Sequence, residues 1–136
     1  MKAIQTCVIL FICTISFTCF ADVSVIVHPS NSSAITEDDI SRMFLGKNKS
    51  FANGNSVDPV NAKYGNGARE EFEDKVLGKS KSQMKAYWSK LIFTGKGKPP
   101  KELSSDEDII AFVASNPDAI GYVASDKVND KVKVIK

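Results

Sequence analysis

Residues 116–123, NPDAIGYV, indicate the fold class because they join the end of a helix directly to an apolar strand. Pro117 ends the helix, since proline cannot continue one, and residues 120–123 form the strand. The helix begins further back, at Ser104 and Glu107, which have the spacing of a capping box. A helix that leads straight into a strand is the repeating unit of α/β proteins.

Two more strands precede this unit. Val23–Val27 is β-branched and stops before Pro29, and the helix that follows has Thr36 as its N-cap. Residues 57–62 form the second strand, and a glycine-rich loop and another helix follow it. We therefore predict an α/β fold with a mostly parallel or mixed central sheet flanked by helices. We also expect the strands at 23–27 and 57–61 to be parallel and adjacent or nearly so. The side chains expected in the core include Phe72, Trp88 and Phe112.

The N-terminus has the pattern of an export signal. Lys2 precedes residues 8–20, which carry no charge and are too few for a membrane span of roughly 20 residues. Cys19 and Ala21 are small residues at the first and third positions before a cleavage site, so residues 1–21 are predicted to be a signal peptide and residues 22–136 a periplasmic domain. An uncleaved anchor helix and a lipidated Cys19 are the alternatives.

The net charge and the residue types present argue against several classes of function. The net charge of +2 falls to +1 once Lys2 is removed. This charge is too small to indicate the basic surface that nucleic-acid binding needs. The predicted mature chain has one histidine, His28, and no cysteine, so it has neither a nucleophile–base pair nor a metal motif. We therefore expect a protein that is not an enzyme and holds no cofactor or metal.

Two polar loops are candidates for ligand binding. Gly65, Asn66 and Gly67 precede a helix whose free N–H groups suit an anion, and Arg69 in its first turn suits an oxyanion. The other loop supplies hydroxyl and amide groups after the first strand, from Ser30, Asn31 and Ser32. If the two strands are parallel, both loops leave the same edge of the sheet and converge on one site. The alternative is that both are structural turns.

A third candidate is a basic loop around two prolines. Lys96, Lys98 and Lys101 surround Pro99 and Pro100. Such loops are usually solvated, so this one ranks behind the two polar loops as an anion site.

Three motifs together resemble a known family, the periplasmic phosphate-binding proteins of ABC uptake systems. Residues 44–47, FLGK, resemble a motif of that family, residues 57–72 fall where its strand, phosphate loop and helix would be, and residues 116–123 resemble its NPGAIGYV. The motifs occur in the family's order and cover most of residues 22–136. The resemblance implies one lobe of the type 2 periplasmic-binding fold, similar to the short single-lobe members.

The phosphate loop departs from the family pattern, which reads Arg-x-Asp-Gly-Ser-Gly-Thr. Only Gly65 and Gly67 match; the residues at the Arg, Asp, Ser and Thr positions are Ala62, Tyr64, Asn66 and Ala68. The resemblance therefore implies weak binding of phosphate or a similar oxyanion for an ABC-type transporter. We expect Arg69, as a surface residue, to supply the missing charge, so that Arg69→Ala abolishes binding and leaves the fold intact.

A different function is compatible with the same residues. The domain then binds no ligand and is an interaction or regulatory module that docks on an inner-membrane transporter, a sensor ectodomain or a second copy of itself. Phosphate binding separates the two functions.

Overall fold

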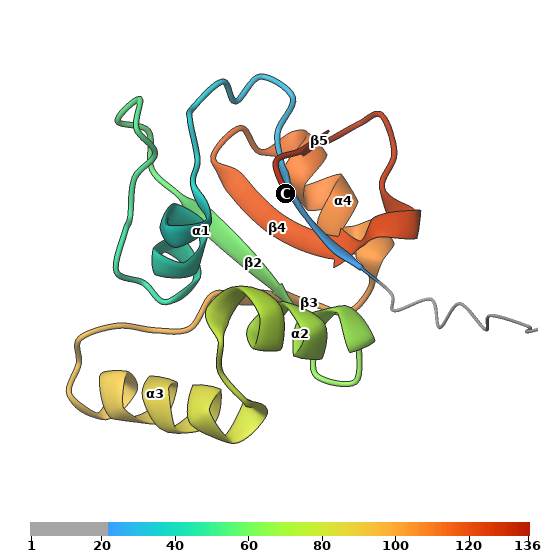
Figure 1. The fold of residues 1–136 in the computed structure, drawn as a ribbon. Coiled ribbons are helices and arrows are strands. Elements are labelled where there is room, and N and C mark those ends of the chain that lie inside the picture. Colours follow the sequence, from blue (N-terminus) through green and yellow to red (C-terminus); the bar gives the residue numbers. More distant parts are fainter. Residues whose placement is uncertain (1–21) are drawn as a thin grey trace, which may run out of the picture.

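A computed structural model describes residues 22–136, and the predicted signal peptide, residues 1–21, lies outside them (Figure 1). The elements in chain order are β1 (Val23–Val27), α1 (Glu37–Phe44), β2 (Asp58–Ala62), α2 (Gly67–Phe72), the π-helical turn η1 (Glu73–Leu77), α3 (Lys81–Phe93), β3 (Lys101–Leu103), α4 (Asp106–Ser115), β4 (Ala119–Ala124), the 3₁₀ turn η2 (Ser125–Lys127) and β5 (Lys133–Val134). None of the helices in this part of the chain is long and apolar enough to cross a membrane.

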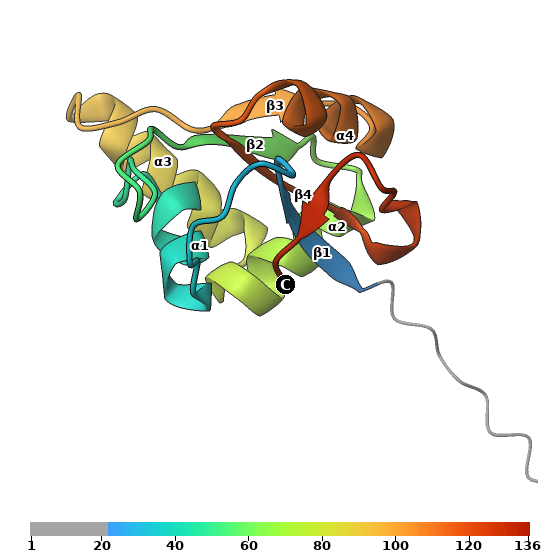
Figure 2. The same cartoon turned by 90° about the horizontal axis from the view of Figure 1, so that it is seen from above.

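The strands form one mixed sheet in the order β3-β2-β4-β1-β5. β2 is parallel to β3 and β4, whereas β1 is antiparallel to β4 and to β5. Helices cover both faces of this sheet (Figure 2). The predicted fold class, a mixed sheet flanked by helices, is confirmed.

β4 takes the central position because its sequence is apolar on both faces. Residues 119–123 are all buried, as expected of a strand covered on two sides. Gly121 faces α4, where an added Cβ would lie 2.9 Å from Ile109 and 3.3 Å from Val113. Glycine at this position therefore lets α4 pack closely against the sheet.

The opposite face of β4 carries an aromatic cluster. The ring of Tyr122 stacks on Phe72 of α2 at 4.0 Å and lies 5.6 Å from Phe44 of α1. All three side chains are fully buried. Rings of this size dominate the burial in a small core, so α1 and α2 are held against the sheet mainly here.

The predicted parallel direction of β1 and β2 is wrong, although the two strands are nearly adjacent, as expected. The two strands are antiparallel and β4 lies between them, because Val27 and Pro59 both pair with Ile120. β2 therefore begins at the edge of the sheet where β1 ends. The segment after α1, residues 45–57, returns the chain to that edge before β2 starts (Figure 1). The rule for parallel crossovers does not apply to such a connection.

Most local predictions of helix starts are confirmed. Thr36 caps α1 and Ser80 caps α3, each with a complete capping box. At α4 the cap is Ser105 and not the predicted Ser104, with Asp108 as the donor of the bonded N–H. Among the aromatic side chains expected in the core, Phe72 and Trp88 are buried and Phe112 is half-buried.

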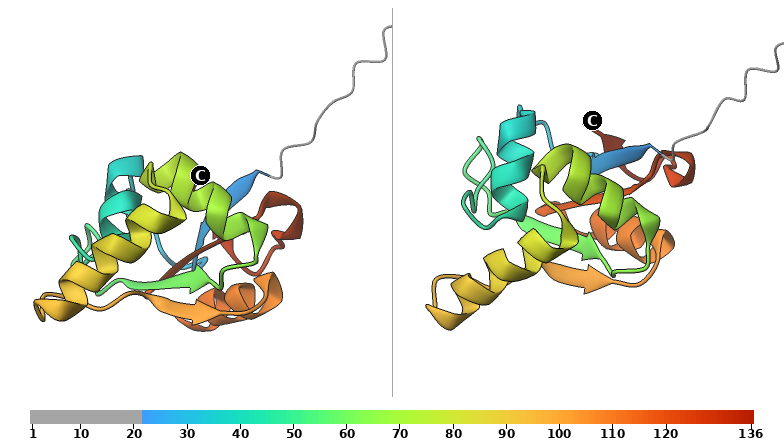
Figure 3. Two further views of the ribbon diagram at one scale, coloured as in Figure 1. Left: turned by 90° about the horizontal axis from the view of Figure 1, so that it is seen from below. Right: turned by 60° about the horizontal axis from the view of Figure 1, so that its bottom comes forward.

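Helix α3 occupies a separate place in the fold. It extends past the end of the sheet where β2 begins (Figure 3). Only Met84 and Trp88 of its residues are buried. The other side chains of α3 are exposed or half-buried.

Candidate functional site

The loop from β2 to α2 has the local structure that its glycines predict. Gly65 has a φ of 97°, a left-handed conformation that glycine adopts at no cost. The Asn66 side chain caps α2 by accepting a hydrogen bond from the N–H of Ala68 at 3.0 Å. Its amide also donates to the Asp106 carboxylate at 2.9 Å, which ties the start of α2 to the start of α4.

Arg69 is buried, with 3% of its surface exposed, so the expectation of a surface arginine is wrong. Its Nη1 donates to the Ala62 carbonyl at 2.9 Å and to the Glu102 carboxylate at 2.7 Å. Its Nε lies 3.5 Å from the Glu73 carboxylate, and the guanidinium stacks 3.6 Å above the Tyr64 ring. Two carboxylates thus neutralise the cation that was expected to hold a ligand.

Only one part of this arrangement could be predicted from the amino-acid sequence. Glu73 is four residues after Arg69 and belongs to the same helical face, which is a recognisable signal for an ion pair. Glu102 comes from β3 and reaches Arg69 only because β3 pairs with β2. Tyr64, which occupies the family's Asp position, covers the guanidinium.

Burial and pairing act in opposite directions on the pKa values of Glu73 and Arg69. Burial raises the pKa of the Glu73 carboxyl above its usual value, against the opposing influence of Arg69 and the Tyr64 hydroxyl. Burial alone would lower the pKa of Arg69, but the hydrogen bond to Glu102 and the neighbouring Tyr122, Tyr64 and Glu73 outweigh it, so the pKa of the guanidinium is raised. Arg69 therefore remains charged and paired.

The motif of β4 also contributes to this edge of the sheet. The Tyr122 hydroxyl accepts a hydrogen bond from the Ala62 N–H at 3.2 Å and donates to the Asn61 side chain at 2.8 Å. Burial raises the pKa of Tyr122, so the hydroxyl keeps its proton. Tyr122 fixes the end of β2 and thereby the start of the loop at Gly65.

The Ser30 loop and the loop after β2 lie at opposite ends of the strands, so the predicted convergence of the two loops does not occur. The Ser30 loop follows the end of β1, which lies at the same end of the sheet as the start of β2. Ser30 bonds to the His28 ring at 2.7 Å, and Asn31 is buried and accepts from the N–H of Ser33. The Lys133 ammonium donates to the Asn31 carbonyl at 3.1 Å. The side chains of Ser30 and Asn31 are thus engaged within the loop, whereas the buried Ser33 hydroxyl has no partner among the described residues.

A cleft of about 900 Å³ opens beside the starts of β2 and β3, next to α3. Its floor and walls are largely apolar and include Leu45, Trp88 and Pro99. Five lysines line it, two from the segment after α1, two from the connection between α3 and β3, and one from the start of β3. We call this feature the lysine cleft and define its cations as Lys47, Lys49, Lys96, Lys98 and Lys101.

Trp88, the only tryptophan of the chain, forms part of the wall of this cleft. It is 6% exposed, and its ring would lie 3.4 Å from a Cβ added at Gly46 and 3.9 Å from one added at Gly97. The neighbouring Tyr87 hydroxyl donates to the Leu45 carbonyl at 2.6 Å. These contacts hold the indole between the FLGK segment and the basic loop, so the wall is preformed.

Only part of this cleft could be predicted from the sequence. Lys96, Lys98 and Lys101 were recognised as a basic loop. No pattern in the sequence links them to Lys47 and Lys49, which lie about fifty residues earlier. The shared helix face of Trp88 and Leu91, which line the same cleft, was the available signal.

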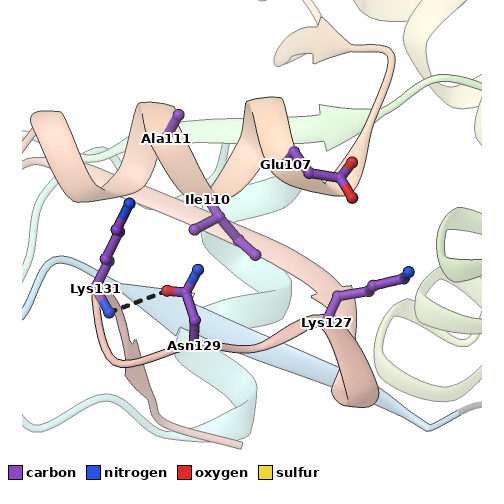
Figure 4. A pocket seen from close by; sticks show the side chains of 6 residues that line it. All are labelled: Glu107, Ile110, Ala111, Lys127, Asn129 and Lys131. Atoms are coloured by element: carbon purple, nitrogen blue, oxygen red, sulfur yellow. Dashed lines mark hydrogen bonds between the residues drawn. The ribbon is translucent and has the colours of Figure 1, made fainter.

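A second pocket, of about 230 Å³, lies between α4 and the C-terminal segment (Figure 4). Glu107 and Ile110 of α4 line one side, and Lys127, Asn129 and Lys131 line the other. The Asn129 side chain accepts from the Lys131 N–H at 3.0 Å. This pocket is much smaller than the lysine cleft. In the part of the chain that the structure describes, no three His, Cys, Asp or Glu side chains are grouped to hold a metal.

Known structures share this fold. An ABC-type phosphate transport receptor from Vibrio cholerae is 16% identical, with a TM-score of 0.66 over 84% of this chain and 45% of that chain. A Clostridium perfringens protein described as a phosphate ABC transporter substrate-binding protein, solved with bound phosphate, is 20% identical with a TM-score of 0.66 over 84% and 44%. PstS from Borrelia burgdorferi is 12% identical with a TM-score of 0.62 over 84% and 46%.

The likeness extends to the fold alone. No protein-family model and no curated protein matches the chain. The chain spans less than half the length of these solved structures, which agrees with the predicted single lobe of the type 2 periplasmic-binding fold.

Proposed function

We propose that this chain is a periplasmic solute-binding domain that binds phosphate or a similar small oxyanion weakly, at the loop between β2 and α2. The fold supports the proposal, since its structural neighbours are named as phosphate-transport proteins. The observation that carries it is the glycine-rich loop at the carboxyl end of β2, where ligands of open α/β sheets bind.

Two backbone donors are available in this loop. The N–H groups of Gly65 and Gly67 have no acceptor within residues 22–136, whereas Asn66 already bonds the N–H groups of Ala68 and Arg69. Both glycines are exposed, so water competes for the anion. Because Arg69 is buried and paired, the oxyanion receives no direct contact from it. The dissociation constant is therefore expected on the order of 1 mM.

Replacing Gly67 by proline tests the proposal with little disturbance of the fold. Gly67 is the first residue of α2, where proline is favoured, and Asn66 already has the extended φ of −86° and ψ of 116° that a following proline requires. The substitution removes one of the two free N–H groups. In a phosphate titration at constant ionic strength, followed by amide chemical shifts, we expect Gly65 and Gly67 to shift in the wild type. Gly67→Pro is expected to show no saturable shift at Gly65.

Glu37→Pro is the matched control because Glu37 is the first residue of α1 and follows the extended Thr36. This variant is expected to bind phosphate as the wild type does. Absence of saturable shifts in the wild type, or equal binding by Gly67→Pro, contradicts the proposal.

The alternative function is docking on a transporter or sensor protein in the membrane. The end of α3 favours it, because Ile92 and Phe93 are adjacent there and are 55% and 92% exposed. Large apolar side chains exposed side by side often mark a contact surface. Failure of the phosphate titration would make this the preferred function.

A further inference from the structure

The lysine cleft carries more positive than negative charge among the residues that the structure describes. Five of the residues that line the cleft are lysines, and only one, Asp58, is acidic. No ion pair within residues 22–136 involves any of the five. Lys101 has one other contact, its ammonium lying 4.6 Å from the centre of the Phe112 ring. A concave surface lined by charges of one sign concentrates oppositely charged molecules.

The cleft is also apolar below its rim. Met43, Leu45 and Trp88 are buried beneath it, and Leu91 and the two prolines at 99 and 100 complete the apolar lining. The volume of about 900 Å³ is that of a site for an organic molecule and far exceeds the size of an inorganic ion. A bare oxyanion would contact the lysines and leave the apolar surface wet.

We propose that the lysine cleft binds an organic anion that carries an apolar or aromatic body, with the anionic group at the lysine rim and the body against Trp88. The anion supplies the charge that the rim lacks, and the body buries the apolar wall. This site lies at the amino ends of β2 and β3, whereas the proposed phosphate loop follows the carboxyl end of β2. A result that contradicts one of the two proposals therefore leaves the other unaffected.

The exposed tip of α3 belongs to a different surface. Ile92 and Phe93 do not line the cleft, although Leu91 does. A lipid surface would be expected to contact the two exposed residues first. The lysines of the cleft come instead from two segments that surround a hollow, which suits a small molecule.

Trp88 makes the proposal directly measurable, because it is the only tryptophan and lies in the cleft wall. The probe is 1-anilinonaphthalene-8-sulfonate, an aromatic anion. Its matched partner is N-phenyl-1-naphthylamine, the same body without the sulfonate, and inorganic sulfate represents the anion without the body. We expect the sulfonate to bind one-to-one with a change in Trp88 emission, and each of the other two to bind at least about fivefold more weakly.

Two variants test separately the contribution of the rim charge and that of the shape of the cleft. Lys96→Gln with Lys98→Gln removes two rim cations and is expected to weaken binding about fivefold. Gly97→Leu adds a side chain whose Cβ lies 3.9 Å from the Trp88 ring, and it is expected to abolish binding with every lysine retained. Lys85→Gln with Lys90→Gln removes two exposed lysines of α3 outside the cleft and is expected to change nothing.

The proposal is overturned if the two double lysine variants lose binding equally. It is also overturned if the naphthylamine binds as tightly as the sulfonate, or if the Trp88 emission does not change. Binding to phosphatidylglycerol vesicles or to a short glutamate peptide, without binding of the sulfonate, would assign the cleft to a membrane or to an acidic protein segment.

Discussion

Two cationic regions lie at opposite ends of β2, and they differ in how their charge is compensated. Arg69, beyond the carboxyl end, is buried and held by Glu73 and Glu102. The lysine cleft, at the amino end, has five exposed lysines without an ion pair among the described residues.

The difference shows which cations are available to a ligand. A charge in the core needs a partner, since an uncompensated buried ion costs several kcal/mol. An exposed lysine is solvated and needs none, so it can exchange water for an anion. The residue whose sequence position most suggested ligand binding, Arg69, is therefore structural, and the loop expected to be merely solvated lines the larger cleft.

The largest expected effect comes from breaking the buried pairs. Arg69→Met keeps most of the side-chain volume but leaves Glu73 buried without a cation and the Ala62 carbonyl without its donor. We expect the free energy of unfolding to fall by about 3–5 kcal/mol, measured by urea denaturation.

The control is Arg42→Met, which removes an exposed ion pair to Asp38. Its cost should be at most about 1 kcal/mol. Equal costs for the two variants would show that Arg69 is not the structural residue that its contacts indicate.

A smaller effect is expected from the pH dependence of Glu73. Burial raises its folded-state pKa above the ordinary value of about 4.5, so the unfolded chain ionises first as the pH increases. The contribution of Glu73 to stability is thus complete below pH 4.5 and is lost as the pH rises through the higher, folded-state pKa. Glu73→Gln lacks this loss, so its stability relative to the wild type should increase from pH 4 to pH 8 in urea denaturation.

The exposed Glu107→Gln on α4 is the matched control for the loss of one carboxylate, because Glu107 is not among the groups that shift the pKa of Glu73. A relative stability of Glu73→Gln that stays flat or decreases with pH would mean that Arg69 outweighs burial at this carboxylate.

The smallest effect should come from the lysine cleft. Lys96→Gln with Lys98→Gln removes no ion pair and no buried contact. We expect the free energy of unfolding to change by no more than about 0.5 kcal/mol, by thermal or urea denaturation. A loss above about 1 kcal/mol would mean that these lysines support the fold, and the contrast with Arg69 would disappear.

Local patterns predicted the elements well and their arrangement poorly. Thr36 and Ser80 were recognised as helix caps because a cap depends on residues three positions apart. The direction of β1 relative to β2 was missed because it depends on residues 45–57, whose path has no periodic pattern. That single error also produced the false convergence of Ser30 with Asn66.

The helices, the strands β1, β2, β4 and β5 and most helix starts could be predicted from the amino-acid sequence alone. Backbone conformation and amphipathic spacing specify these features over a few residues. The short strand β3 was not predicted, and neither was the contact of its Glu102 with Arg69 or the cleft that Lys47 shares with Lys96. Such pairings depend on which strands are neighbours and on how burial penalises an unpaired charge, and both are properties of the packed domain.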